Sequence, residues 1–392
     1  MSSERRRIVA ALSGGVDSAV AAARLVDAGH EVTGVHLALA RDTASDAPGS
    51  APGARPSRGC CTAQDARDAA RIADVLGIAF YVWDVSEAFE REVIADFLTE
   101  YARGRTPHPC ARCNERIKFA TVLNRAIALG FDALATGHYA RIEPADPATG
   151  RGPTLHRGAD PGKDQSYVLA MLTADQLATV VLPLGDAHKD EVRREAARRG
   201  LTVAAKPDSH DICFIPQGST RAWLAARLPA RPGRIVDGAT GRILGEVADL
   251  TGLTVGQRRG VGLPTISSDQ QRRYVTAIDV ATATVTVGAL TDSEVTLIVG
   301  GGAQWCGPAP GVGWRGRVQV RAHGETTPAV LTDVGAGRTV LTCELPVRGI
   351  APGQLAVLYE GTRVVGSFTM DRSAPGVAPA AVAADVVRGV SG

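Results

Sequence analysis

A short segment near the start of the chain combines the residue types of a phosphate-binding loop. Residues 13–18 read Ser-Gly-Gly-Val-Asp-Ser, after a predicted strand and at the start of a predicted helix. Glycines let backbone N–H groups approach an anion closely, and the first turn of a helix carries partial positive charge. The hydroxyls of Ser13 and Ser18 can donate to phosphate oxygens, and Asp17 can either cap the helix or hold a magnesium ion. No lysine follows the second glycine, so the segment is not a Walker A loop.

Cysteine is the second residue type here that can do chemistry. The chain has seven cysteines, and an odd number in a long chain argues against a disulfide framework. Cys113 and Cys213 lie in polar, proline-containing segments, which favours catalysis over burial. Cys110 precedes Cys113 by three residues, and such a pair can be a redox pair or half of a metal site. Burial as small hydrophobic side chains is the preferred interpretation for Cys60, Cys61, Cys306 and Cys343.

The phosphate loop and the cysteines must be positioned by strands and helices, and these alternate over residues 1–205. We expect strands at 6–12, 30–39, 79–85 and 131–138, and helices near 18–29, 62–76, 87–102 and 117–130. This alternation predicts an α/β fold with a doubly wound parallel sheet, in which ligands bind beyond the carboxyl ends of the strands. Residues 41–59 are rich in Gly, Pro, Ala and Ser and are expected to form a mobile loop.

The pattern changes after residue 205. Residues 206–274 carry Gly, Pro and Arg with short helical pieces, which predicts a small central domain. Short alternating strands separated by turn residues follow over 275–371, and they favour an antiparallel β-barrel. Residues 372–392 are low in complexity, so we expect a disordered tail.

Composition and charge narrow the class of protein. The net charge of +2 gives no global basic field, so a nucleic-acid site would have to be a local patch. Lysine occurs only at positions 118, 163, 189 and 206, which we attribute to composition rather than to function. No uncharged apolar run of about 18 residues occurs, and the apolar start leads into the phosphate loop instead of a cleavage site. We therefore expect a cytoplasmic protein with no membrane span.

Ordered stretches of the chain resemble one family of enzymes. The hexapeptide 13–18 is similar to the PP-loop of N-type ATP pyrophosphatases, which cleave ATP between the α- and β-phosphates and adenylate a carbonyl oxygen. Residues 104–119 and 206–216 resemble motifs of the tRNA-specific 2-thiouridylases. Further segments similar to this family are 135–141, 163–167, 255–260 and 351–354, so the resemblance runs from residue 11 to about residue 358.

The resemblance implies a fold, a reaction and partners. The fold is a PP-loop domain of the adenine nucleotide alpha hydrolase type, a central tRNA-binding domain and a C-terminal β-barrel. The reaction adenylates the 2-carbonyl of the wobble uridine with ATP and Mg²⁺, and persulfide sulfur then replaces that oxygen to give 2-thiouridine, AMP and pyrophosphate. The expected partners are tRNAs of the Lys, Glu and Gln type and a sulfur donor such as a cysteine desulfurase or a sulfur-relay protein.

The resemblance also assigns roles to individual residues. Cys213 would carry the persulfide and Cys113 would be the nucleophile, with a transient disulfide between them. Arg112, Arg116 and Lys118 are candidates for lowering the pKa of a reactive thiol. The residues expected to bind ATP are Ala11, Leu12, Ser13, Gly14, Gly15, Val16, Asp17, Ser18, Leu37 and Gly137. The residues expected to contact tRNA are His108, Pro109, Cys110, His138, Lys163, Asp164, Gln165, Gln257, Arg258 and Gln354.

Two positions depart from the family pattern. Cys110 stands where the family often has Asp, and His108 stands where it usually has Asn. The acid–base role considered for that Asp cannot be carried over, so His108 is either its substitute or a surface loop residue. Cys110, Cys113 and Cys213 could also hold an iron–sulfur cluster with one open iron. The main interpretation is a persulfide route without a metal.

Two other functions would use part of the same features. A PP-loop ligase or amidotransferase acting on a small molecule would share residues 13–18, but it would not need Cys113 and Cys213. A tRNA-binding protein without enzymatic activity would use the barrel and the basic run Gln257–Arg259. ATP consumption that depends on tRNA and on both cysteines would separate sulfur transfer from these two alternatives.

Overall fold

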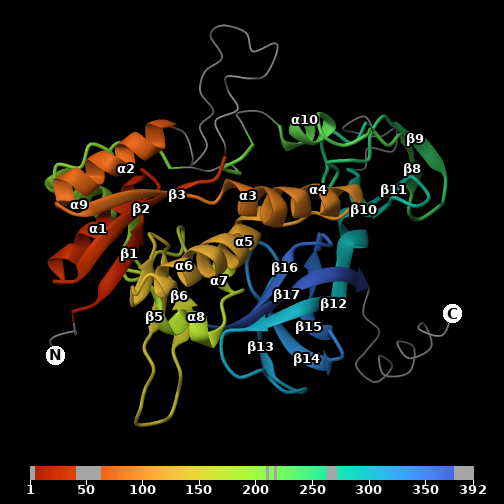
Figure 1. Cartoon of the computed structure of the whole chain (residues 1–392). Coiled ribbons are helices and arrows are strands. Elements are labelled where there is room, and N and C mark those ends of the chain that lie inside the picture. Colours follow the sequence, from red (N-terminus) through yellow and green to blue (C-terminus); the bar gives the residue numbers. More distant parts are fainter. Residues whose placement is uncertain (1–4, 41–62, 209–211, 216–218, 263–271, 375–392) are drawn as a thin grey trace, which may run out of the picture.

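The computed structural model describes residues 5–40, 63–208, 212–215, 219–262 and 272–374 (Figure 1). These residues form three sheets, and helices surround the N-terminal one. No helix within these ranges is long and apolar enough to cross a membrane. The expectations for the loop 41–59, for Cys60 and Cys61 and for residues 375–392 lie outside the described residues.

A five-stranded parallel sheet forms the N-terminal part of the molecule. Its strand order is β3-β2-β1-β4-β7, and every paired neighbour runs parallel. The predicted doubly wound parallel sheet is therefore confirmed, with β7 as an edge strand that the sequence pattern did not indicate. The strands are β1 (Arg7–Ala11), β2 (Glu31–Ala38), β3 (Ala79–Asp84), β4 (Ala133–Ala135) and β7 (Val180–Val181).

Alternate residues of β1 send their side chains to opposite faces of this sheet, as the twofold repeat of a strand requires. Ile8 and Ala10 join an apolar cluster with α1, α2 and α9, whereas Val9 joins a second cluster with helices that lie between β3 and β4 in the chain. The helices on the first face are α1 (Val16–Asp27), α2 (Ala63–Leu76) and α9 (Lys189–Arg198). Those on the second face are α3 (Ser86–Phe89), η1 (Glu90–Ile94), α5 (Pro109–Cys113), η2 (Asn114–Val122) and α6 (Leu123–Ala128). Helix α4 (Ala95–Ala102) continues η1 and buries Phe97 in a separate cluster with Trp223 and Leu224.

A hairpin from the N-terminal half extends the sheet of the C-terminal barrel. Strand β5 (Ala140–Glu143) pairs with β6 (Thr154–Arg157), and β6 meets the last barrel strand at His156. The short helices α7 (Ser166–Leu169) and α8 (Ala174–Ala178) follow. The buried Tyr167 hydroxyl of α7 donates to the Leu355 carbonyl of the barrel at 2.8 Å. The barrel is thus joined to the N-terminal domain by strand pairing and by a buried hydrogen bond.

A four-stranded sheet in the order β10-β11-β8-β9 forms the middle of the chain, after α10 (Thr220–Ala225). Its strands are β8 (Gly233–Asp237), β9 (Ile243–Val247), β10 (Tyr274–Asp279) and β11 (Thr284–Gly288). We expected the barrel to begin at residue 275, and this is wrong for β10 and β11. The reason is that β11 pairs in parallel with β8, and Val275 and Val285 bury their side chains with Ile235 of that strand.

The remaining strands close into the predicted antiparallel barrel, because β12 pairs with β15 on one side and with β17 on the other. Strand β14 was not expected from the sequence. Strand β17 continues to Ala374, so residues 372–374 belong to the barrel rather than to the expected tail. A short 3₁₀ turn, η3 (Leu290–Ser293), precedes β12 (Glu294–Trp305), β13 (Arg315–Gln319), β14 (Thr327–Gly335), β15 (Arg338–Arg348), β16 (Leu355–Glu360) and β17 (Arg363–Ala374).

Candidate active site

The phosphate loop connects the carboxyl end of β1 to the start of α1, where doubly wound sheets bind ligands. Gly14 has a φ of +73°, and a Cβ at this position would collide with the carbonyl of Asp65 at the start of α2. Only glycine meets both conditions. Gly15 is the N-cap of α1, and no side chain among the described residues caps it. The N–H groups of the first helical turn are therefore left for an anion.

The serine hydroxyls fix the shape of this loop. Ser18 Oγ accepts from the Ser13 N–H at 3.2 Å, donates to the Gly15 carbonyl at 3.0 Å and lies 3.2 Å from Ser13 Oγ. Leu12 and Val16 are buried in the core, so only their backbone can reach a nucleotide. Ala11 and Leu37 are partly buried against the cluster on the other face of the sheet.

Asp17 does not cap α1. Its carboxylate accepts from Lys189 Nζ, at 2.7 Å to both oxygens, and from the Tyr139 hydroxyl at 2.7 Å. The capping role that the sequence left open is therefore wrong, because α9 supplies a cation that binds the carboxylate. Gly137 lies behind this turn, since a Cβ there would come within 2.8 Å of the backbone of Asp17 and Ser18. The close approach at Gly137 is made by α1 itself.

The segment around Cys113 forms helix α5, which lies on the face of the sheet opposite to α1. His108 is the N-cap of α5, and its Nδ1 accepts from the Ala111 N–H at 3.3 Å. Pro109 is buried, Cys110 is exposed and Cys113 is 7% exposed. Burial lowers the pKa of His108 to about 4. The His108 imidazole is neutral and caps the helix. It is therefore not a free surface residue, and it does not hold a proton near neutral pH.

Cys213 reaches the same part of the molecule through its aromatic neighbour. The Phe214 ring packs edge-on against Phe89 and Phe97, with centroids 5.7 and 5.3 Å away, and against Trp223 at 5.3 Å. Cys213 is partly buried against the apolar cluster that contains Phe89 and Cys113. Two segments that lie a hundred residues apart in the chain are thus packed on the same helices.

Two observations bear on the remaining thiols and on a metal site. No three His, Cys, Asp or Glu side chains in the described ranges are grouped to hold a metal ion, and these ranges include Cys110, Cys113 and Cys213. The expected burial of Cys306 and Cys343 is confirmed, and it raises the pKa of each to about 12.

The arginines beside Cys113 share their charge with carboxylates. Arg112 pairs with Asp96 at 3.3 Å and with Glu115 at 2.6 Å, and Arg116 pairs with Glu115 at 3.3 Å. These ion pairs weaken the positive field that was expected at Cys113.

All three domains meet at the turn that precedes α5. The Thr106 N–H donates to the Pro352 carbonyl at 2.7 Å, and Gln354 Nε2 donates to the Thr106 carbonyl at 2.7 Å. The Thr106 hydroxyl donates to that of Thr254 at 3.2 Å, and Thr254 N–H in turn donates to Gln257 Oε1 at 3.0 Å. Gln257 and Gln354, both expected to contact tRNA, therefore lie around the motif that holds His108 and Cys113. Arg258 follows in the same loop and is half-buried.

Several other expected tRNA contacts are engaged inside the protein. Asp164 accepts from Arg157 at 2.7 Å and from the Ser166 hydroxyl at 3.0 Å, and Gln165 Oε1 accepts from the Tyr139 N–H at 3.0 Å. His138 is buried, and its Nδ1 lies 2.7 Å from the Thr136 hydroxyl. Burial also lowers the pKa of His138, helped by the charge of Lys118. These contacts favour a structural role for His138.

Family models and related proteins match this chain over most of its length. Three family models match in succession: the tRNA methyl transferase HUP domain over residues 6–217, the tRNA methyl transferase PRC-barrel domain over 221–289 and the aminomethyltransferase β-barrel domain over 296–370. A protein of Acidothermus cellulolyticus named tRNA-specific 2-thiouridylase MnmA is 55% identical over 370 residues, 94% of this chain and 98% of its own. The chain belongs to the tRNA-specific 2-thiouridylase family. Another member, from Mycolicibacterium vanbaalenii, is 54% identical over 93% of this chain and 99% of its own.

This 2-thiouridylase family member has functional candidates that sequence reasoning missed. Asp208 accepts from Lys163 at 2.7 Å, from Lys189 at 2.9 Å and from Arg193 at 2.5 Å. Burial would raise the pKa of Asp208, but the hydrogen bonds and charges of Lys163 and Lys189 outweigh burial and hold it at about 2. Lys206 donates to the Gly14 carbonyl at 2.9 Å.

The low number of lysines was a signal that could have identified Lys189 and Lys206 as candidates. Lys163, Lys189 and Lys206 are three of only four lysines in a chain with 43 Lys and Arg residues, and all three lie in this network. Our attribution of the low lysine count to composition alone overlooked this placement.

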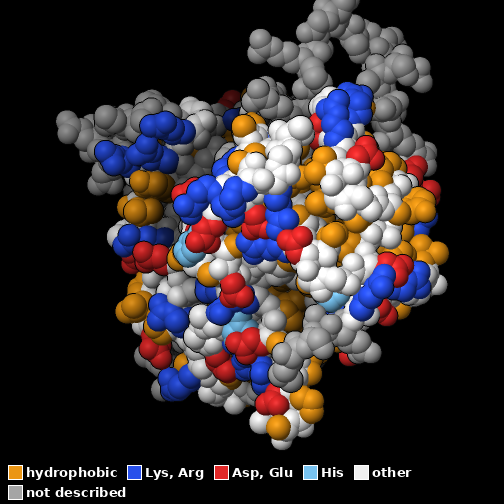
Figure 2. All heavy atoms as spheres, turned by 90° about the vertical axis from the view of Figure 1, so that its left-hand side faces the viewer, with side chains coloured by type: hydrophobic (Ala, Val, Ile, Leu, Met, Phe, Trp, Pro, Cys, Tyr) orange, Lys and Arg blue, Asp and Glu red, His pale blue; other side chains and the backbone are white. Residues whose placement is uncertain are grey.

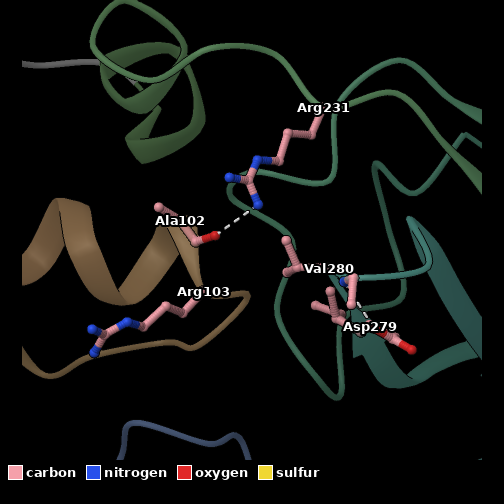
Figure 3. Close-up of a pocket in the computed structure, with 7 residues that line it drawn as sticks. Ala102, Arg103, Arg231, Asp279 and Val280 are labelled. Atoms are coloured by element: carbon pink, nitrogen blue, oxygen red, sulfur yellow. Dashed lines mark hydrogen bonds between the residues drawn. The ribbon is translucent and has the colours of Figure 1, made fainter.

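The surface of this family member is electrically mixed. Basic and acidic side chains are intermingled on the face of the N-terminal domain that Figure 2 shows, in keeping with the small net charge. A cavity of ≈ 630 Å³ opens between the end of α4 and the loop after β10, and it is lined by Arg103, Arg231 and residues 278–281 (Figure 3). Arg231 Nη1 donates to the Ala102 carbonyl at 3.1 Å across this junction. None of the residues that the sequence singled out lines the cavity.

Proposed function

We propose that this chain is an ATP-dependent tRNA sulfurtransferase that converts the wobble uridine to 2-thiouridine. The strongest support comes from the segment that carries Cys213. This segment contacts the phosphate loop at one end and the helices around Cys113 at the other. Lys206 binds the Gly14 carbonyl, while Phe214 packs against Phe89. A small-molecule ligase with a PP-loop has no need of such a segment. Relatives that span 93% or more of this chain and carry the 2-thiouridylase name support the same choice.

The proposed reaction begins with the nucleotide on the phosphate loop. The uridine O2 attacks the α-phosphorus of ATP, the bond from that phosphorus to the bridging oxygen breaks, and pyrophosphate leaves. The backbone N–H groups of the first α1 turn stabilise the negative charge on the phosphates. Mg²⁺, bound with ATP, would neutralise further phosphate charge. The adenylated oxygen can now leave C2 as AMP, whereas an unmodified carbonyl oxygen would have to leave as oxide, which is a poor leaving group.

Sulfur transfer then uses both cysteines. The terminal sulfur of a Cys213 persulfide attacks C2, and AMP departs with the electron pair of the C–O bond. The Cys113 thiolate attacks Cys213 Sγ, a Cys113–Cys213 disulfide forms, and the C2-bound sulfur leaves with the electron pair as 2-thiouridine. A thiol reductant restores the two thiols, and a sulfur donor such as a cysteine desulfurase or a relay protein reloads Cys213.

The turn at Thr106 is the proposed entry for the flipped base. Enzymes that act on a base must take it out of its stack, and this turn lies where all three domains can surround it. Gln257, Arg258 and Gln354 would then contact tRNA around His108, Pro109 and Cys110. Arg103 and Arg231 at the cavity would bind backbone phosphate: Arg231 lies at the junction between domains, and the exposed Arg103, which pairs with Glu100 at 3.3 Å, extends away from it (Figure 3).

The experiment is thiolation of unmodified tRNA by the full chain with ATP, Mg²⁺ and a persulfide donor, with AMP and 2-thiouridine measured together. We expect stoichiometric formation of both, and loss of thiolation in Cys113→Ser and Cys213→Ser. Full activity of both serine variants would contradict sulfur transfer through these residues. A parallel assay with anaerobically reconstituted protein tests the iron–sulfur alternative, which predicts activity only after iron and sulfide are supplied.

A further inference from the structure

Lys189 is bound to Asp17 of the phosphate loop although the two residues are 172 positions apart in the sequence. Its Nζ lies 2.7 Å from both oxygens of Asp17 and 2.9 Å from Asp208, and its side chain is 9% exposed. Asp17 is the second residue of α1, the helix whose first turn binds the anion in our proposal. The ammonium group of Lys189 is therefore separated from the proposed phosphate position by only the side chain of Asp17.

The helix that carries Lys189 is aligned with α1. Ion pairs join the two helices in the same order along both: Asp17 with Lys189, Arg24 with Glu195 at 2.7 Å and Asp27 with Arg199 at 2.5 Å. The helices therefore run parallel, and both amino-terminal ends lie at the phosphate loop. Lys189 is the first residue of α9, so its side chain and the end of that helix place positive charge at the same point.

The partners of Lys189 can release it without leaving a buried carboxylate alone. Asp208 keeps Lys163 and Arg193, at 2.7 and 2.5 Å, and Asp17 keeps the Tyr139 hydroxyl. Phosphate oxygens carry more negative charge than a carboxylate and form strong charge-assisted bonds with an ammonium group. A phosphate group placed over the loop therefore competes well for Lys189, whereas an isolated buried ion pair would resist such an exchange.

The position of α9 also indicates which phosphates Lys189 can meet. Helix α9 packs on the face of the sheet that holds Ile8 and Ala10, while Cys113 lies in the cluster on the opposite face. In phosphoryl and nucleotidyl transfer the attacking and leaving oxygens are roughly in line. With uridine and the cysteines on one side of the α-phosphorus, the leaving group points to the side of Lys189.

We propose that Lys189 binds the β- and γ-phosphates of ATP and then the departing pyrophosphate. This inference rests on the proposed use of ATP, but it is independent of the tRNA reaction. Lys189 exchanges one carboxylate for phosphate oxygens, so it neutralises charge on the leaving group without entering the α-phosphate contacts of the α1 turn.

The test compares a ligand that contains both the adenosine α-phosphate part and the β- and γ-phosphates of ATP with ligands that contain only one of these two parts. Calorimetric titration of the full-length chain in a magnesium buffer uses α,β-methylene-ATP, AMP and pyrophosphate. In Lys189→Met we expect affinity for the methylene analogue and for pyrophosphate to fall by about tenfold or more, and affinity for AMP to stay within about twofold. Lys189→Arg keeps the charge and should recover most of the affinity for both phosphate ligands. Arg24→Met removes the matched ion pair farther along α1 and α9 and should leave all three affinities unchanged.

Three results would overturn the inference. Equal losses for AMP and for the methylene analogue would assign Lys189 a purely structural role. Unchanged pyrophosphate affinity in Lys189→Met would remove it from the phosphate site, and losses of the same size in Arg24→Met would show that only helix packing matters. If Lys189→Met does not fold, Lys189→Gln, which still donates hydrogen bonds to Asp17, replaces it with the same outcomes. No titration contains tRNA or a sulfur donor, so failure of the proposed thiolation would not affect the result.

Discussion

The amide of Gln354 donates to the carbonyl of Thr106 at 2.7 Å, across an interface between the barrel and the N-terminal domain. A second bond from the same amide reaches the Pro107 carbonyl at 3.3 Å. The barrel thereby holds the turn that leads directly into α5, and with it the position of Cys113. This contact explains why a domain far from the phosphate loop in sequence can matter for the chemistry.

Replacing Gln354 should therefore lower the rate of thiolation while leaving the ATP site intact. We expect Gln354→Ala to reduce kcat by about tenfold or more and to lower the free energy of unfolding by about 1 kcal/mol, with KM for ATP unchanged. Gln176→Ala is the matched control, because Gln176 also donates a side-chain bond to a backbone carbonyl, that of Phe119 at 2.6 Å. Equal activity in the two variants would contradict a positioning role for Gln354.

Cys110 separates the persulfide route from a metal site. Cys110 is exposed at the start of α5, whereas Cys113 is buried. A persulfide route uses Cys113 and Cys213 alone, so Cys110→Ser should keep activity within about threefold, while Cys113→Ser should lose about a thousandfold or more. An iron–sulfur cluster on three cysteines would instead make all three serine variants inactive. Thiolation rates together with iron content of the purified protein decide between them.

The low pKa of His108 predicts a specific dependence on pH. The folded state holds this pKa at about 4 while the unfolded chain has 6.5, so the unfolded state binds more protons between these values. His108 therefore subtracts stability progressively as the pH falls from 6.5 to 4. His108→Asn keeps an N-cap and should flatten this part of the stability curve, as measured by urea unfolding, whereas His108→Ala should lose about 1 kcal/mol at pH 8. An unchanged slope in the Asn variant would show that His108 titrates normally.

Asp208 should control the exposure of Cys213, which follows it by five residues. Asp208→Asn removes the charge that Lys163, Lys189 and Arg193 share, so we expect the segment to loosen and Cys213 to be alkylated several-fold faster by iodoacetamide. Peptide mass spectrometry after brief labelling measures this rate. Asp27→Asn breaks the exposed pair with Arg199, at 2.5 Å, and should not alter it.

The same carboxylate should contribute to acid stability. The pKa of Asp208 is held at about 2 instead of 3.8, so its stabilising effect is complete above 3.8 and is lost as the pH falls towards 2. Asp208→Asn should therefore unfold with a shallower dependence on pH in this range, followed by circular dichroism. A slope equal to that of the natural chain would contradict the strong pairing.

The arginines at the cavity provide a test of the tRNA surface. Arg231→Ala and Arg103→Ala should each weaken tRNA binding and reduce the slope of log K against log salt by about one, because each would remove one phosphate contact. Arg348→Ala is the control, since this barrel arginine pairs with Glu294 at 2.5 Å. Filter binding at several salt concentrations measures the slopes. Unchanged slopes for both cavity variants would place tRNA elsewhere.

The local pattern of the sequence predicted four of the five strands of the N-terminal sheet. Ile8, Val9 and Ala10 alternate between two faces because a strand has a twofold repeat, and the glycine turn at Gly14 follows because only glycine tolerates its conformation. These features depend on neighbours in the chain, so they can be read without a structure. The family motifs around Cys113 and Cys213 carry the same kind of local information.

Contacts between distant segments could be decided only by the tertiary structure. Three contacts join residues that no local pattern connects. They are the ion pair of Lys189 with Asp17, the hydrogen bond from Gln354 to Thr106 and the pairing of β11 with β8. Charged and amide side chains find partners through space, and the energy of such a bond depends on burial and distance rather than on separation in the chain. For that reason the sequence identified Cys113 and Cys213 as candidates, while the tertiary structure was needed to show that the Lys189 cation lies beside the phosphate loop.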